Sequence, residues 1–265
     1  MSPAKKRARA YDPAKIRAAV LTQFTHVREA VVSLTPEQLA GPTRLGEWTV
    51  RDLAAHLAMA VESVSRGLAR EEPPKPELTL TDWPFATATR AAAIADRTRS
   101  LADANPDLDA FYARTGERFT ASLATAPETR VLAARTGAMT LADYLVTRTV
   151  ELIVHTDDLN AAVPGLDVPC DRQALAACTR LLADALAAKA PGGSTEVRIP
   201  PYAVVQCVEG PRHTRGTPAN VVETDPLTWI RLATGRVTWP EAIENAQVSA
   251  SGERADLSGL LPLMG

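Results

Sequence analysis

One of the four histidines in this chain of 265 residues stands at the spacing of a metal-ligand pair. His155 follows Glu151 by four residues within a segment of helical periodicity, so both side chains project from one face of a helix. The HExxH motif of zinc enzymes uses the same i, i+4 geometry for two ligands, although here the first ligand would be a carboxylate. An ordinary exposed pair of helical side chains is the alternative.

His56 is the third candidate ligand. It lies in the segment DLAAHLAMA, among small and apolar residues, on a helix that should be largely buried. A core histidine with a satisfied hydrogen bond is the alternative. If this helix faces the one that carries Glu151 and His155, the three residues form a set of two histidines and one carboxylate. Catalytic zinc sites use sets of this kind and keep one coordination position open.

Two carboxylates are placed to orient these histidines. Asp52 lies four residues before His56, and Asp158 lies three residues after His155. Either carboxylate could accept the second imidazole proton of its histidine, as the outer partners of metal ligands commonly do. The alternatives are a helix cap for Asp52 and a surface charge near the helix end for Asp158.

Arg148 adds a cation to the same helix face. It lies three residues before Glu151 and could form a plain intrahelical ion pair with that carboxylate. A planar guanidinium also suits bidentate contact with a carboxylate, so Arg148 is equally a candidate for binding an anionic substrate.

The elements that would position these residues are helices. Apolar residues recur at helical spacing from Pro13 to about Leu34, and Thr49 followed by Asp52 predicts a cap that begins a helix running toward Arg70. Further helical patterns span 85–104, 108–124, 141–162 and 172–190, and loops are predicted at 35–47, 71–84 and 126–137.

The composition changes after the run Pro191-Gly192-Gly193, which we interpret as a domain boundary. The β-branched runs EVRI, YAVVQCVEG, ANVVET and QVSASG predict short strands, and 225–235 and 239–245 predict helices between the last two. We therefore expect a disordered basic tail at 1–10, a metal-binding helical bundle at 11–190 and a small α+β domain at 195–265.

The overall composition excludes several classes of protein. With 46% hydrophobic and 23% charged residues and a formal net charge of -2, the chain is typical of globular domains and not of disordered or nucleic-acid-binding proteins. No apolar stretch approaches the length of a membrane span, and the N-terminus lacks the apolar core of a secretory signal. We expect a cytoplasmic protein with no nucleic-acid or membrane partner.

Two separated motifs resemble a known family. GEWTVRDLAAHL (46–57), followed downstream by RTVELIVHTDDLNAA (148–162), resembles the mycothiol-dependent maleylpyruvate isomerases, a branch of the DinB-like metal-binding bundles. The resemblance covers most of residues 11–190. It implies an up-down four-helix bundle, a zinc ion on His56, Glu151 and His155, and mycothiol, a small thiol, as cosubstrate.

The chain from Glu196 onward resembles a bacterial sterol-carrier-protein-like domain, most clearly in DPLTWIRLATGRVTWPEAIENAQVSASGERADL. Isomerases of this family append such a domain, and the resemblance implies that one of its arginines takes part in activity. Arg236 is the closest match and Arg231 is the rival. The usual carrier pattern has a glycine before the last strand, where this chain has Asn245-Ala246.

Together these features predict an α+β two-domain enzyme that uses zinc and a small-molecule thiol. It would be an isomerase or an S-transferase acting on a small electrophile that carries a carboxylate. Arg236 and Arg148 are the candidate catalytic residues, because either could hold that carboxylate. The competing hypothesis is a non-catalytic carrier whose C-terminal domain holds a lipid or another apolar ligand, with a structural metal or none.

Overall fold

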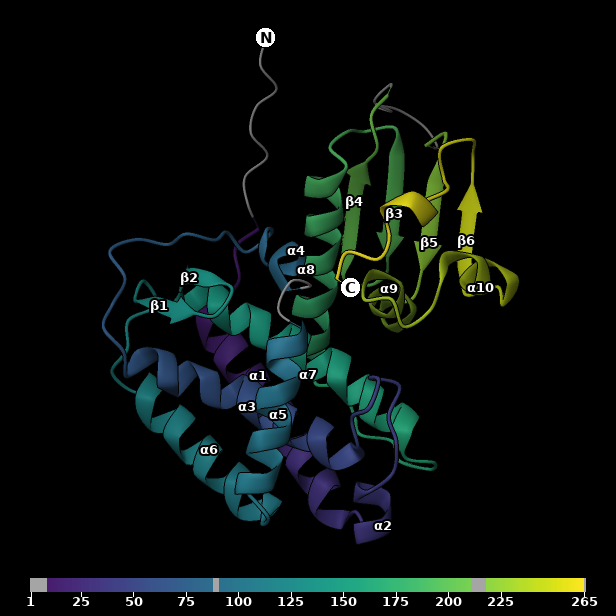
Figure 1. Ribbon diagram of the computed structural model, residues 1–265. Helices are drawn as coiled ribbons and strands as arrows, with labels where there is room; N and C mark the ends of the chain where they lie inside the picture. The colour runs from purple at the N-terminus through teal and green to yellow at the C-terminus, as the bar shows by residue number, and fades with distance from the viewer. Residues whose placement is uncertain (1–8, 88–90, 211–217, 265) are drawn as a thin grey trace.

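The computed structural model describes residues 9–87, 91–210 and 218–264 and has a helical N-terminal domain beside a small α+β domain (Figure 1). This arrangement confirms the α+β two-domain fold expected from the sequence. Most of the basic tail expected at 1–10 lies outside the described residues. None of the described helices is long and apolar enough to span a membrane.

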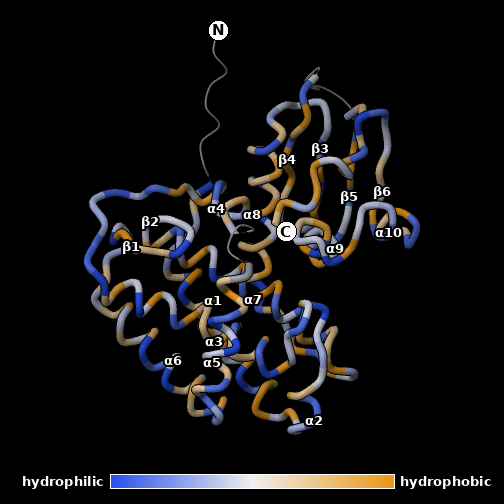
Figure 2. The backbone as a smooth tube through the Cα atoms, viewed as in Figure 1, coloured by the Kyte–Doolittle hydropathy of each residue, from blue (hydrophilic) through white to orange (hydrophobic). Residues whose placement is uncertain are grey.

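Within the described residues, four long helices form the N-terminal bundle: α1 (Pro13–Ser33), α3 (Val50–Leu68), α6 (Leu108–Leu123) and α7 (Leu141–Ala162). Both α1 and α3 pack against α6 and α7. Their apolar faces share one core, in which α3 is buried along most of its length. Figure 2 shows polar and apolar residues alternating along α6, as expected for a helix with one face toward the core and one toward water.

The helix that carries His56 begins at the predicted cap. The side chain of Thr49 accepts a hydrogen bond from the backbone N–H of Asp52 at 3.2 Å. In return, the Asp52 carboxylate accepts from the Thr49 backbone at 2.9 Å and from its hydroxyl at 2.7 Å, which completes a capping box. This cap fixes the first turn of α3 and, about two turns later, the position of His56.

Part of the segment predicted as a loop at 126–137 is instead a β-hairpin. Strands β1 (Val131–Ala134) and β2 (Gly137–Thr140) pair antiparallel, and the paired residues Leu132 and Met139 are fully buried. Strands of four residues are too short for a period of two to stand out in the sequence. The remaining helices of this domain are the short α2 (Pro36–Leu39) and α4 (Trp83–Thr87), and α5 (Ala91–Ala104), which packs on α3.

Helix α8 (Arg172–Lys189) joins the two domains. It packs against α1 and α7 of the bundle and against the sheet of the α+β domain, beside which it runs in Figure 1. The sheet has the strand order β4-β3-β5-β6. Its members are β3 (Thr195–Ile199), β4 (Ala203–Cys207), β5 (Val221–Thr224) and β6 (Val248–Ser251), with β3 and β5 parallel and the other pairs antiparallel.

Within its described residues, the C-terminal domain also contains the helices α9 (Pro226–Ala233) and α10 (Trp239–Glu244) and a 3₁₀ turn at Ser258–Leu260. Val197 on the central strand β3 lies opposite Val205 and Val222, and all three are buried. Trp229 of α9 is 1% exposed and donates its indole N–H to the backbone oxygen of Thr179 on α8 at 3.3 Å. These side chains form the core between the sheet and its helices.

Ala246 is one of the two residues, with Asn245, that stand before the last strand, where the carrier-like resemblance leads us to expect a glycine. Its φ is 54°, a left-handed conformation that favours glycine because a Cβ is crowded there. We expect Ala246→Gly to raise the free energy of unfolding by about 0.5–1 kcal/mol, measured by urea denaturation. The neighbouring variant Asn245→Gly is the control, since Asn245 has a φ of -84° and should lose stability on substitution. Equal effects of both substitutions would contradict this explanation.

Candidate metal centre

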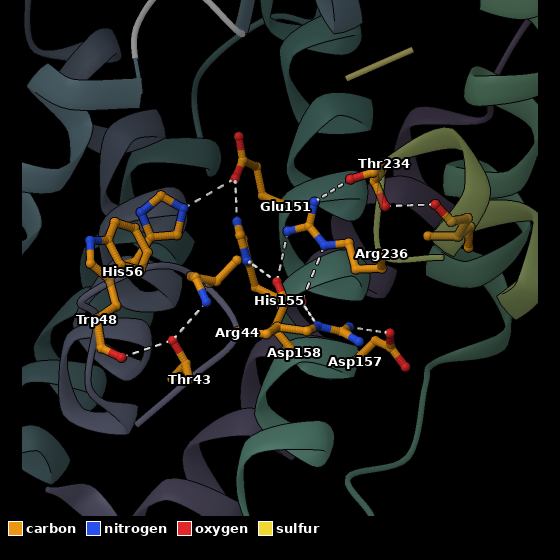
Figure 3. A network of polar contacts seen from close by, with 12 residues as sticks. Thr43, Arg44, Trp48, His56, Glu151, His155, Asp157, Asp158, Thr234 and Arg236 are labelled. Carbon is orange, nitrogen blue, oxygen red and sulfur yellow. Dashed lines mark hydrogen bonds and ion pairs between the residues drawn. The ribbon is translucent and has the colours of Figure 1, made fainter. Parts of the chain in front are cut away.

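His56 on α3 and the pair Glu151 and His155 on α7 converge where these two helices pack together (Figure 3). The Nε2 atom of His56 lies 3.3 Å from Oε2 of Glu151, and Nε2 of His155 lies 3.6 Å from the same oxygen. One ligand atom from each residue lies within 4.8 Å of the other two. The structure therefore brings together the three residues singled out in the sequence.

These distances suit a tetrahedral cation. With metal–ligand bonds of about 2.1 Å, two ligand atoms of a tetrahedral zinc ion lie about 3.4 Å apart. The two separations between a histidine Nε2 and Oε2 of Glu151, 3.3 Å and 3.6 Å, are close to that value. Two imidazoles and one carboxylate also form a donor set that zinc accepts, and three protein ligands leave a fourth position for a substrate. The residues present thus fit a divalent metal.

Asp158 orients the ring of His155. Its Oδ2 accepts a hydrogen bond from Nδ1 of His155 at 2.8 Å, which leaves Nε2 to face the other ligands. Burial alone would raise the pKa of Asp158, but hydrogen bonds from His155 and Arg236 hold it well below its usual range. Burial alone would likewise lower the pKa of His155, and contacts with Asp158 and Glu151 raise it instead. The carboxylate is thus kept ionised beside the ligand.

Asp52 takes the capping role that was its alternative, since its carboxylate accepts the hydrogen bonds of Thr49. The group beside Nδ1 of His56 is the hydroxyl of Thr98, a buried residue of α5, at 3.4 Å. The ring of Trp48 lies beside the ring of His56, with the two centroids 5.0 Å apart. Burial lowers the pKa of His56, which favours the neutral form that binds metals.

Three arginines surround the two adjacent carboxylates at the end of α7. Arg44, which precedes α3, donates to Asp158 at 2.6 Å and to Asp157 at 2.5 Å. Arg236 donates to Asp158 at 2.8 Å, and Arg231 donates to Asp157 at 2.5 Å. Arg231 and Arg236 belong to the α+β domain, so these five residues form an interdomain network. The network includes Asp158, the hydrogen-bond partner of His155, and Figure 3 shows Arg44, Asp157, Asp158 and Arg236.

The candidate ligands line a cavity of about 620 Å³, which follows α3 from His56 to Gly67 and reaches Arg70 just beyond the helix. Arg148 and Arg236 are both part of its wall. The Arg148 guanidinium lies 4.4 Å from the ring centroid of Tyr144, and its Nη2 is 3.8 Å from Oε1 of Glu151. Both candidate catalytic arginines therefore border the space next to the metal centre.

Several contributors to the site lack a signal in the sequence. Arg44 lies in a loop rich in proline and glycine, and Thr98 sits on a helix with no spacing relation to His56. Asp157 has a weak signal, since it directly precedes Asp158 and two adjacent acids at a helix end oppose the helix dipole. An unfavourable charge pair of this kind indicates that cations from elsewhere in the fold lie nearby.

Comparison with known proteins finds relatives of both domains. The family model of the mycothiol maleylpyruvate isomerase N-terminal domain matches residues 20–160, and the model of the bacterial SCP ortholog matches residues 171–263, which include α8. Two similar solved structures are the crystal structure of a mycothiol-dependent maleylpyruvate isomerase and that of its histidine-to-alanine mutant. Each alignment covers 93% of this chain and 95% of the other, with a TM-score of 0.59 and identities of 13% and 14%. No curated protein matches the chain.

Proposed function

This chain belongs to the mycothiol maleylpyruvate isomerase family, and from this premise we propose that it is a zinc-dependent enzyme that uses a small thiol, mycothiol, to act on an electrophile. The observation that carries the proposal is the convergence of His56, Glu151 and His155 on one point in the wall of a cavity. Isomerases and S-transferases of this kind begin with the same attack by sulfur, so the proposal covers both.

His56, Glu151 and His155 would hold the cation through one atom each. When bound, a divalent cation lowers the pKa of a coordinated thiol, about 8.5 when free, so that the nucleophilic thiolate predominates at neutral pH. The protein prepares the ligands for this role. Asp158 keeps Nε2 of His155 directed into the site, and burial keeps His56 neutral.

The electrophile would lie in the cavity beside these residues. Sulfur adds to its activated double bond, and the π electron pair moves onto the conjugated carbonyl oxygen. Rotation about the resulting single bond, followed by return of the electron pair and loss of the thiolate, completes an isomerisation. In a transferase the adduct takes up a proton and the carbon–sulfur bond remains. Arg236 and Arg148 border this space and would hold a carboxylate of the electrophile.

The direct test is turnover of maleylpyruvate and other conjugated acids by protein supplied with zinc, with and without mycothiol. We expect turnover that requires both the thiol and the metal, so that protein treated with a chelator and dialysed is inactive until zinc is restored. Turnover that continues without any thiol would contradict the proposal.

Arg236→Ala is expected to leave the zinc content intact and to reduce turnover about a hundredfold, the usual cost of losing one donor aimed at developing charge. Arg231→Ala is the matched control, because it also removes an interdomain ion pair but, among the described residues, is not part of the cavity wall. Normal turnover in Arg236→Ala would show that Arg236 does not take part in turnover. An equal loss of turnover in both variants would show that the effect comes from the lost ion pair between the two domains.

A carrier function of the α+β domain is the second candidate, supported by its match to the bacterial SCP ortholog. The interior of that domain is packed with buried side chains, among them Val197, Val222 and Trp229. A carrier would have to open this core to admit an apolar ligand. Lipid that co-purifies with the protein, together with no thiol-dependent turnover, would favour this function over the enzymatic one.

A further inference from the structure

Four arginines gather along the cavity away from the metal centre: Arg66 in the last turn of α3, Arg70 just after it, Arg97 on α5 and Arg135 in the β1–β2 turn. Three of them, Arg66, Arg70 and Arg135, line the cavity. Burial and then the charge of Arg97 lower the pKa of Arg66, and burial and then the charge of Arg135 lower the pKa of Arg97. The members of this arginine cluster are thus close enough to repel one another.

The arginine cluster has more hydrogen-bond donors and positive charge than the nearby acceptors and carboxylates satisfy. Glu62 pairs with Arg66 at 3.1 Å, one turn away on the same helix. The Nε atom of Arg97 is buried and has no hydrogen-bond partner among the described residues. A buried donor without an acceptor is unfavourable, and in native proteins such a group commonly indicates a missing ion, water or ligand. An anion with several oxygen acceptors, placed among these arginines, would accept hydrogen bonds from their guanidinium groups and reduce their mutual repulsion.

Three arginines of the cavity wall outside the cluster lie beside carboxylates. Arg236 contacts Asp158, Arg148 lies near Glu151, and Arg99 contacts Asp96 at 2.9 Å. Among the described residues, Arg66, Arg70 and Arg97 share one nearby carboxylate, Glu62, so positive charge exceeds negative charge at the end of α3 that lies away from His56.

Distance separates the cluster from the metal centre. Arg66 follows His56 by ten residues on α3, a rise of about 15 Å along the helix axis. The reach of an arginine side chain shortens this gap, so a ligand that touches both places would be about 10–15 Å long. A small diacid is too short to place one end at each.

We infer that the arginine cluster is a second anion-binding subsite, which holds a multiply charged terminal group, such as a phosphate or paired carboxylates, of an elongated substrate whose reactive end lies at the metal centre. The identity of the reactive end rests on the proposed function. The anion subsite itself does not, because its contacts are independent of zinc and thiol. Either the electrophile or the thiol could carry the charged group.

The kinetic test locates that group. In the double variant Arg66→Gln/Arg97→Gln, the KM for the substrate that carries the anion is expected to rise about tenfold or more, because charge-assisted hydrogen bonds are lost. A higher KM for the electrophile alone places the group on the electrophile, and a higher KM for the thiol alone places it on the thiol. Unchanged values of both would overturn the subsite. Arg118→Gln, which removes an exposed arginine of α6, is the control.

A binding test needs no turnover, so it separates failure of the subsite from failure of the proposed function. Sulfate, titrated against chloride at constant ionic strength, is expected to raise the Tm of wild-type and Arg118→Gln protein, and this shift should vanish in the double variant. Equal shifts in all three proteins would overturn the inference. Because the double variant could fold poorly, crystals of wild-type protein soaked in selenate supply a second readout. An anomalous peak among the four arginines is expected, and selenate bound only elsewhere would overturn the inference.

Discussion

Protein in which Glu151 is replaced by alanine is expected to keep its fold and lose its zinc. Wild-type protein purified without chelator or metal-affinity resin should contain about one zinc ion per chain, and Glu151→Ala and His56→Ala should contain almost none. Removing one of three ligands leaves two side chains that cannot enclose a cation. Thiol-dependent turnover should fall by about a thousandfold or more, because the cation supplies several kcal/mol of the stabilisation that turnover requires. Elemental analysis and turnover assays measure both effects.

His26→Ala is the matched control for the histidine variant. His26 lies on α1, where its Nδ1 is 3.1 Å from the backbone oxygen of Pro169, and it does not belong to the cluster of candidate ligands. This variant should retain zinc and turnover. Wild-type protein that contains no metal, even after zinc is supplied, would rule out the zinc-dependent enzyme and direct attention to the α+β domain.

The second large effect concerns Asp158. Its carboxylate is fully buried and contacts His155, Arg44 and Arg236, so Asp158→Asn leaves Arg236 without its anion and Arg44 with Asp157 alone. We expect the free energy of unfolding of zinc-free protein to fall by about 3 kcal/mol. Zinc affinity should also fall, by about 10-fold to 100-fold, because His155 loses the partner that orients its ring. Urea denaturation and competition with a zinc-binding dye measure the two effects separately.

Asp157→Asn separates orientation of the ligand from contact between the domains. Asp157 takes part in the same interdomain network through Arg44 and Arg231, but the partner of His155 is Asp158. Asp157→Asn should therefore destabilise the protein while leaving zinc affinity within about threefold of wild type. If both variants weaken zinc binding equally, the network acts through the domain interface and not through the His155 ring.

The contribution of Asp158 to stability should also depend on pH. The pKa of Asp158 in the folded protein lies below its value in the unfolded chain, about 3.9. A group of this kind contributes its full stabilisation above the unfolded pKa and loses it as the pH falls toward the folded pKa. The free energy of unfolding of zinc-free wild type should thus decrease below about pH 4, and Asp158→Asn should show a smaller decrease over that range.

The two helices that position the candidate ligands could be predicted from local sequence patterns. The cap formed by Thr49 and Asp52 placed the start of α3, and the apolar periodicity of 141–162 placed α7. With both helices in place, the i, i+4 spacing put Glu151 and His155 on one face. That α3 faces α7 was the step that spacing could not supply, because it depends on how the helices pack.

The parts that the sequence did not reveal depend on long-range contacts. Arg44 reaches the end of α7 from a loop more than 100 residues earlier in the chain, and Thr98 reaches His56 from a helix that the sequence connects to no function. The hairpin of β1 and β2 was missed because its stability comes from burying Leu132 and Met139 against the bundle. The position of Asp52 fits both a helix cap and a partner of His56. The hydrogen bonds to Thr49 show that it is the cap.

The interdomain network also limits how proteins of this architecture can exchange parts. Arg44, Asp157 and Asp158 come from the bundle, whereas Arg231 and Arg236 come from the α+β domain. A recombinant that joins this bundle to an α+β domain without arginines at both positions would bury carboxylates beside His155 with too few cations to neutralise them. The two halves therefore have to be inherited as a matched pair.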